Sequence, residues 1–290
     1  MNRITLFLAL LVIALIQSCS ETQKSDKPVI TVSILPQKYF VERIAGDRFD
    51  INVLTPPGAS PETYEPTPRQ MKTLGTSVLY FANGYLMFED RIADKLGREF
   101  ALKTIELSRG IDLIAGDIVD HGDHVHLYGI DPHYWLSTTE VRIQAKNIMQ
   151  ALLLVDPDHA DEYEANFADF MADIDKLDEH IRETLSQSRI RTFLIYHPAL
   201  AYFARDFELE QVALETDGKE PTASHLKYIV DLAREYQINT ILIQSQFNMT
   251  AAEAVAREIN GRVVLVDPLP EDWLQNMYEV AHVIHQALNP

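Results

Sequence analysis

Two histidines and two carboxylates stand where they could together bind a divalent metal ion: Glu62, His133, His197 and Asp267. Neutral imidazole nitrogen and carboxylate oxygen both bind zinc, at about 2.0–2.2 Å. Taken singly, each residue has an ordinary explanation. His197 before a proline is usually a hydrogen-bonded residue, Asp267 before a proline is by default a turn residue, and Glu62 in a proline-rich loop is by default solvated. Only their shared placement in connections between apolar runs favours a metal site.

Three further histidines lie just upstream of His133, in the segment His-Gly-Asp-His-Val-His that contains His121, His124 and His126. Histidine interspersed with aspartate is a compositional signal for metal binding. A loop of this kind could capture zinc weakly and pass it inward. The alternative is a solvated loop that happens to hold three histidines. We treat the segment as an auxiliary metal loop, separate from the four candidate ligands.

Short apolar runs that end at turn residues predict the strands that must position these side chains. The first half of the chain has four: Val29–Pro36, Asp50–Pro57, Val78–Gly84 and Lys103–Ser108. The second half repeats the rhythm at Arg191–Pro198, Glu210–Thr216, Thr240–Gln246 and Arg262–Pro268. Helical patterns such as Gln37–Ala45 and Pro68–Thr76 lie between strands, which indicates parallel sheets in an α/β fold. Ligands bind beyond the carboxyl ends of such strands, where His197 and Asp267 are expected.

One long amphipathic helix is predicted between the two halves. Asp156-Pro157 has the pattern of an N-cap followed by proline at the first helical position. Apolar residues then recur at spacings of three and four, at Tyr163, Phe167, Phe170, Ile174, Leu177, Ile181 and Leu185. From Pro157 to about Gln187 the helix would extend roughly 45 Å. We therefore expect two lobes joined by a rigid helix; the alternative is a long surface helix of one larger domain.

The N-terminus has the pattern of an export signal. Arg3 is followed by the apolar run Leu6 to Ile16, which is too short for a membrane span of about 20 residues. Cys19 follows Ile16-Gln17-Ser18, a segment that resembles the lipobox of bacterial lipoproteins. We expect lipidation at Cys19, a membrane anchor, and a location in the periplasm or on the cell surface. The alternative is that Cys19 merely falls near a plain signal cleavage site.

These patterns divide the chain into five parts. We expect a signal peptide at 1–18, a lipidated tether at 19–27, an N-terminal metal-binding lobe at 28–155, a linking helix at 156–187 and a C-terminal metal-binding lobe at 188–290. A length of 290 residues with 47% hydrophobic residues is sufficient for two cores.

Charge and cysteine content exclude several classes of function. Asp and Glu number 43 against 25 Lys and Arg, so the net charge is −18. Such a chain repels polyphosphate, which argues against general nucleic-acid binding. A single cysteine excludes internal disulfides and thiolate metal clusters.

Five segments of the chain resemble motifs of the metal-binding solute-binding proteins of bacterial ABC importers, the zinc and manganese uptake group. They are the segments 57–66 (PGASPETYEP), 83–84 (NG), 131–136 (DPHYWL), 196–199 (YHPA) and 265–269 (LVDPL). The resemblance covers essentially everything after the tether. It implies two (β/α)-type lobes with parallel sheets joined by one long rigid helix, and one metal buried in the cleft between them. It also implies delivery of that metal to an ABC permease powered by a separate ATPase.

Carried over by position, His133 and His197 match histidine ligands of the zinc-type members, and Asp267 matches the carboxylate that these proteins supply late in the chain. Glu62 departs from the family, which normally has histidine there. The resulting set of two histidines and two carboxylates is the composition usual for manganese-type members, although those place a carboxylate at the position of His197. His197 and the histidine-bearing loop favour zinc as the bound metal, whereas the harder, oxygen-rich donor set leaves manganese or ferrous iron as alternatives. A third possibility is that Glu62 does not bind, and His126 or water completes the site.

The favoured function is an exported receptor that binds one divalent ion tightly, performs no chemistry on it and delivers it to a permease. A secreted metallohydrolase would need an open coordination position and a nearby general base, and the chain has no His-Glu-x-x-His segment. A role in cell adhesion or as a structural surface protein is the third alternative, and nothing beyond the acidity marks a surface for it. A monomer is expected from the family.

Overall fold

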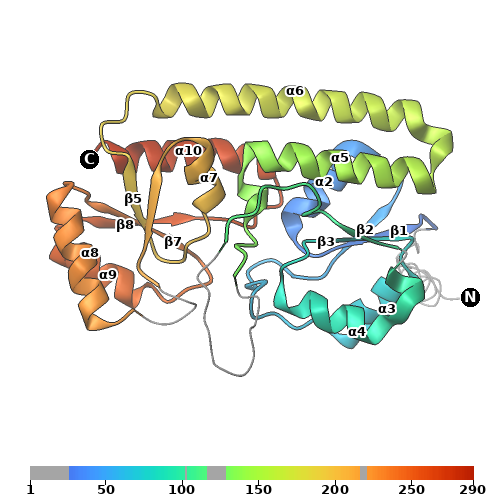
Figure 1. Cartoon of the computed structure of the whole chain (residues 1–290), viewed down its shortest axis with the longest axis horizontal. Helices are drawn as coiled ribbons and strands as arrows, with labels where there is room; N and C mark the ends of the chain where they lie inside the picture. The colour runs from blue at the N-terminus through green and yellow to red at the C-terminus, as the bar shows by residue number, and fades with distance from the viewer. Residues whose placement is uncertain (1–25, 102, 116–128, 216–220) are drawn as a thin grey trace, which may run out of the picture.

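Two four-stranded parallel sheets form the centres of two lobes (Figure 1). The computed structural model describes residues 26–101, 103–115, 129–215 and 221–290. The strands are β1 (Val29–Val32), β2 (Asp50–Val53), β3 (Leu79–Ala82), β4 (Thr104–Glu106), β5 (Thr192–Ile195), β6 (Glu210–Ala213), β7 (Thr240–Gln244) and β8 (Arg262–Val266). Their orders, β2-β1-β3-β4 and β6-β5-β7-β8, are the same. All eight predicted strands are confirmed, and each is shorter than its apolar run.

Helices cover both faces of the sheets. They are α2 (Leu35–Ala45), α3 (Pro68–Thr76), α4 (Met87–Ala101), α5 (Thr138–Val155), α6 (Ala160–Leu185), α7 (Ala201–Asp206), α8 (Ala223–Glu235), α9 (Met249–Glu258) and α10 (Trp273–Leu288), with 3-10 turns η1 (Tyr134–Leu136) and η2 (Pro157–His159). In Figure 1, α6 crosses the top of both lobes, with α5 and α10 directly beneath it. Helices α3, α4, α8 and α9 lie on the opposite side of the sheets.

Helix α6 is the predicted linking helix, and it is continuous over 26 residues. Its apolar stripe is buried, including Tyr163, Phe170 and Ile174. Asp156 is the N-cap of the 3-10 turn η2 and Pro157 is its first residue, but the Asp156 side chain makes no capping hydrogen bond to a backbone amide. The Asp156 carboxylate instead accepts hydrogen bonds from His159 Nδ1, at 2.8 Å, and from the Tyr163 hydroxyl. The chain therefore enters α6 through the 3-10 turn η2. Side chains from η2 and from the first turn of α6 hold the Asp156 carboxylate in place.

The two lobes share one apolar core. Phe40 from α2, Phe170 from α6 and Trp273 from α10 are fully buried, and their ring centroids lie 5.3–6.3 Å apart. Helix α10 is the last element of the chain, yet its first residue packs against the first helix of the N-terminal lobe. The lobes are thus joined by packing as well as by the linking helix.

Hydrogen bonds from buried aromatic side chains also cross between the lobes. The indole N–H of Trp135 donates to the carbonyl of Pro268 at 2.6 Å, and that of Trp273 donates to the carbonyl of Trp135 at 2.7 Å. The Tyr202 hydroxyl donates to the carbonyl of Asp131 at 2.7 Å. Because all three donors are buried, breaking any of these bonds would leave an unpaired polar group in the interface.

Several predictions from the sequence fall outside the described residues. They concern the signal peptide at 1–18, Cys19, and the auxiliary histidines His121, His124 and His126. They stay predictions. Among the helices that the structure does describe, none is long and apolar enough to cross a membrane.

We expect Trp273→Ala to destabilise the whole protein, by about 3–5 kcal/mol, because it removes a fully buried ring and an interlobe hydrogen bond. Both lobes should still unfold in one transition in urea, followed by circular dichroism, because the core is shared. Leu154→Ala is the control: this side chain belongs to a residue that is 82% exposed, and its loss should cost less than about 0.5 kcal/mol. Separate transitions for the two lobes would contradict the shared core.

Candidate metal-binding site

Glu62 lies in a single turn of the loop that follows β2. The amides of Thr63 and Tyr64 donate to the carbonyl of Ser60 at 3.2 and 3.0 Å, which closes the turn around it. The Tyr64 hydroxyl then donates to Gln70 Oε1 at 2.8 Å, which anchors the turn to the first residues of α3. The Glu62 side chain is 31% exposed, so one side of the carboxylate faces solvent.

His133 is held by the aspartate two residues before it. Asp131 Oδ1 accepts from both the backbone amide of His133, at 2.8 Å, and its Nδ1, at 2.7 Å. The carbonyl of Pro132 accepts from Asn83 Nδ2 at 3.1 Å, so the turn after β3 supports this segment. The next residue of that turn, Gly84, has φ +97°, and a side chain there would meet Ser108 Oγ at 2.7 Å. A tight turn that only glycine accommodates therefore lies behind His133.

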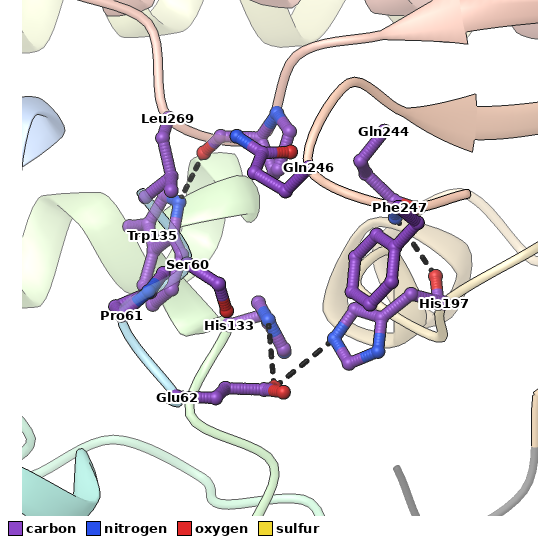
Figure 2. A pocket seen from close by; sticks show the side chains of 11 residues that line it. Ser60, Pro61, Glu62, His133, Trp135, His197, Gln244, Gln246, Phe247 and Leu269 are labelled. Atoms are coloured by element: carbon purple, nitrogen blue, oxygen red, sulfur yellow. Dashed lines mark hydrogen bonds and ion pairs between the residues drawn. The ribbon is translucent and has the colours of Figure 1, made fainter. Parts of the chain in front are cut away.

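His197 comes from the C-terminal lobe, two residues after β5. Its ring stacks on Phe247, with centroids 4.8 Å apart and an interplanar angle of 18° (Figure 2). Gln244 Nε2 donates to the His197 carbonyl at 2.9 Å. On the far side of the ring, His197 Nδ1 lies 3.3 Å from Glu215 Oε1. Stacking, backbone bond and carboxylate together turn Nε2 toward Glu62, whose Oε1 lies 3.0 Å away.

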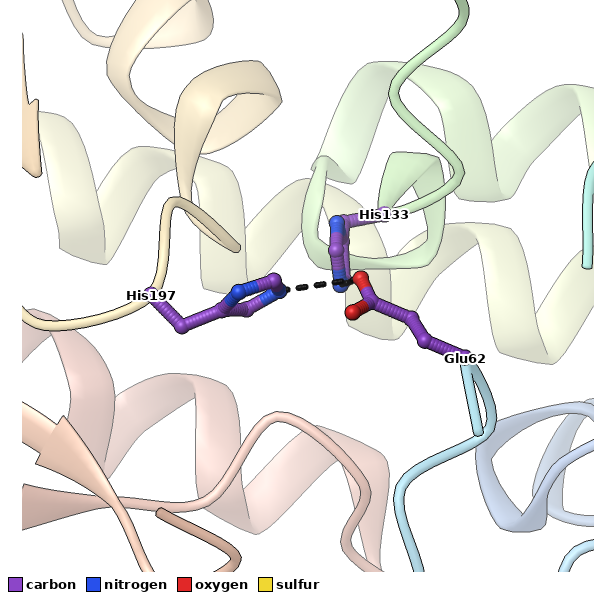
Figure 3. Close-up of side chains that lie close together, drawn as sticks. All are labelled: Glu62, His133 and His197. Atoms are coloured by element: carbon purple, nitrogen blue, oxygen red, sulfur yellow. Dashed lines mark ion pairs between the residues drawn. The ribbon is translucent and has the colours of Figure 1, made fainter. Parts of the chain in front are cut away.

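The three side chains converge although they come from two lobes. Glu62 Oε1 lies 3.0 Å from His197 Nε2 and 3.7 Å from His133 Nε2 (Figure 3). One ligand atom from each residue falls within 4.8 Å of the others. Carboxylates accept the hydrogen bond at Nδ1 of both rings, so in the neutral rings Nε2 carries the lone pair that a metal needs.

A cavity of about 20 Å³ adjoins the three ligand atoms, which is room for about one water-sized guest. Trp135, Phe247 and Leu269 contribute apolar walls, and Figure 2 shows these side chains around the ligand group. Both histidines are less than 10% exposed. A small site with apolar walls of this kind strengthens the attraction between a cation and the carboxylate.

The electrostatics of the metal-free site follow from this burial. Burial lowers the pKa of His197, but hydrogen bonds to Glu215 and Glu62 outweigh it and raise the pKa to about 9. Burial raises the pKa of the Glu62 carboxyl, but the hydrogen bond to His197 and the nearby His133 bring it below its usual value. At neutral pH, His197 is therefore a cation paired with Glu62, and a metal ion must displace its proton.

The structure does not bring the fourth predicted ligand into this group. Asp267 directly follows β8 as predicted, but it is exposed, and its Oδ1 accepts from the amide of Leu269 at 2.9 Å. The next two residues, Pro268 and Leu269, do line the cavity. The role of Asp267 as a ligand stays a prediction.

Residues 30–287 match the protein family described as "Zinc-uptake complex component A periplasmic", ZnuA. The chain belongs to the ZnuA family. Members are solute-binding components of ABC uptake systems and not enzymes, so the predicted family and class are confirmed. The family is periplasmic by its description, in agreement with the predicted export.

Individual relatives support the same assignment. The high-affinity zinc uptake system protein ZnuA of Bacillus subtilis is 27% identical over 259 residues, which cover 86% of this chain and 81% of that protein. A crystal structure of a ZnuA deletion mutant with zinc bound is 39% identical and superposes with a TM-score of 0.82, covering 90% of this chain and 98% of that one. The manganese-bound solute-binding protein FpvC of Pseudomonas aeruginosa shares the fold at a TM-score of 0.78, with 22% identity and coverage of 91% and 99%. The two-lobed α/β fold is thereby confirmed.

Two carboxylates of the site, Asp131 and Glu215, were not predicted from the sequence. Both are hydrogen-bonded to the Nδ1 atoms of the candidate ligands. Glu215 is the last but one residue of the predicted run Glu210–Thr216, as Asp267 is of Arg262–Pro268, so the signal that selected Asp267 was present for Glu215 as well.

We expect the metal-free protein to lose stability as the pH rises from about 6.5 to 9. The folded-state pKa of His197, about 9, exceeds the ordinary value of 6.5, so the stabilisation is complete below pH 6.5 and is lost as pH passes through 9. Urea unfolding in the presence of a chelator measures the effect, and NMR of the His197 ring assigns it. His197→Gln should remove the pH dependence in this window. A ring that titrates near 6.5 would contradict the ion pair with Glu62.

Proposed function

We propose that this protein is an extracytoplasmic receptor that binds one divalent transition metal, preferably zinc, and delivers it to an ABC permease for uptake. The observation that carries the proposal is the convergence of Glu62, His133 and His197 on a small buried cavity between the lobes. A bound ion would contact both lobes at once. The zinc-bound ZnuA structure, at 39% identity over nearly its whole length, supports zinc as the bound metal.

The donor set supports zinc over the alternatives. Two imidazole nitrogens and a carboxylate oxygen are typical of zinc, whereas manganese prefers more oxygen. Glu62 replaces the histidine that the family normally has, and its carboxylate oxygen is a harder donor than an imidazole nitrogen. Manganese and ferrous iron are therefore the alternative cargoes, and the shared fold of a manganese-bound protein shows that the fold alone does not select the metal.

We propose Asp267 as the fourth ligand. Its backbone leads directly into the cavity wall, and a change of side-chain rotamer would exchange the Leu269 amide for the ion. The divalent ion with its direct ligands, two neutral imidazoles and Glu62, carries a net charge of +1. Asp267 as a further direct ligand would make that set neutral, which favours burial of the loaded ion.

The remaining parts of the proposal rest on the sequence. Cys19 would carry the lipid anchor, and His121, His124 and His126 would form an auxiliary loop that captures metal. The partners would be the permease and its ATPase, with the receptor acting as a monomer.

We expect His197→Ala to lower zinc affinity by more than the roughly 10–100-fold that loss of an outer hydrogen-bonding partner costs, because a ligand itself is lost. Asp267→Asn should weaken binding to a smaller extent. Competition with a chromophoric chelator measures both. His282→Ala, an exposed histidine on α10, is the control and should bind as the unmodified protein does. Equal affinity in His197→Ala and the unmodified protein would rule out the proposed site.

We expect the unmodified protein to bind zinc more tightly than manganese, and Glu62→His to increase that preference by roughly tenfold or more, because imidazole is the softer donor. Competitive titration of both metals measures the ratio. Glu65→His is the matched control: it lies in the same loop, is ion-paired with Arg91, and should leave the ratio unchanged. A ratio that does not respond to Glu62→His would mean that Glu62 is not a ligand.

A further inference from the structure

Glu215 is a buried carboxylate in the wall of the site. It follows β6, and its backbone continues the pairing with the neighbouring strand: the amide of Leu214 donates to Ile195 at 2.8 Å, and that of Glu215 donates to Tyr196 at 2.9 Å. This pairing places Glu215 beside the residue that precedes His197. Its side chain is only 5% exposed.

A carboxylate at that depth costs several kcal/mol in lost hydration unless a partner compensates. Among the described residues, the side-chain partner recorded for Glu215 is His197 Nδ1, at 3.3 Å, and no lysine or arginine is paired with it. If Glu215 served only the packing of the C-terminal lobe, its partner would not need to be His197, a candidate metal ligand. The contact therefore points to the orientation of the His197 ring.

The N-terminal lobe contains the same arrangement, built from different elements. Asp131 Oδ1 lies 2.7 Å from His133 Nδ1, and both rings turn Nε2 toward Glu62. One carboxylate comes from a strand end and the other from the segment before η1. Two unrelated local structures thus place a carboxylate on the far nitrogen of each candidate ligand.

We propose that Glu215 is a positioning residue for metal binding: it fixes the tautomer and ring orientation of His197, so that Nε2 faces the ion. The inference rests on the proposed function. A carboxylate that accepts from Nδ1–H also makes Nε2 a stronger donor to the metal. Glu215 thereby adds affinity from the C-terminal lobe without contacting the ion.

Glu215 tests this idea more cleanly than Asp131. Asp131 also accepts from the backbone amide of His133, so its replacement would disturb the chain as well as the ring. The carboxylate of Glu215 contacts the ring of His197, while its own backbone is held by Tyr196. Side-chain replacements at Glu215 therefore leave the backbone contacts in place.

The experiment compares Glu215→Gln and Glu215→Leu with the unmodified full chain. Gln keeps an acceptor for Nδ1–H without the charge, whereas Leu removes both. We expect zinc affinity to fall about 10–100-fold in Glu215→Leu. The affinity of Glu215→Gln should lie between that of Glu215→Leu and that of the unmodified protein. Glu210→Gln is the matched control on the same strand, where the carboxylate accepts from Thr192 Oγ1 at 2.9 Å, and it should bind zinc normally.

A spectroscopic readout separates positioning from general stability. In the cobalt(II)-loaded protein, the Nδ1–H protons of His133 and His197 should give two exchangeable, hyperfine-shifted NMR signals. Glu215→Leu should speed solvent exchange of the His197 signal alone, because only that proton loses its acceptor. A merely destabilised protein would change both signals.

The outcomes distinguish the two levels of the proposal. If the unmodified protein binds none of zinc, manganese and iron, the proposed function fails. If it binds zinc and both Glu215 variants match it in affinity and in the His197 signal, only the positioning role of Glu215 is overturned. Equal losses in Glu210→Gln and Glu215→Gln would likewise overturn it, since the effect would then belong to β6 as a whole.

Discussion

The buried hydrogen bonds of two tryptophans set the geometry on which the site depends. Trp135 donates across the interface to Pro268, and Trp273 donates back to Trp135, so each indole satisfies its N–H on a neighbouring element. Trp135 lies two residues after His133, and Pro268 borders the same cavity. Ligands from separate lobes must meet within a few ångströms, and this requires lobes that keep one relative position. A shared aromatic core and a continuous α6 meet that requirement.

The architecture was predictable because its signals are local and repeated. Eight apolar runs with turn residues between them indicate two parallel sheets, and Pro68–Thr76 is the helix that the sequence predicts, to the residue. The stripe of α6 was readable for the same reason, since helical periodicity extends over many residues. The partners of the Asp156 side chain were not, because Tyr163 and His159 come within reach of that carboxylate only once the helix has formed.

The site was predictable in part. His133, His197 and Glu62 could be selected because parallel strands and their connections bring such residues to one edge, whatever their side-chain rotamers. Asp267 shows the limit of that rule: backbone position does not decide whether a carboxylate turns to an ion or to the amide two residues on. Glu215 shows another limit. Its contact with His197 depends on the pairing of β5 with β6, which single-strand patterns do not specify.

In the proposed site a proton and the metal would occupy the same place, which accounts for a buried cluster of charges that exists without its cargo. With no ion bound, the protonated His197 pairs with Glu62 across the lobes, and Glu215 holds the other side of the ring. When an ion binds, it takes over the charge that the proton supplied at Nε2. The carboxylates thus have a positive partner in both states, and neither state requires the lobes to separate. Glu62, the most exposed of the three ligands, is then the one that an incoming ion meets first.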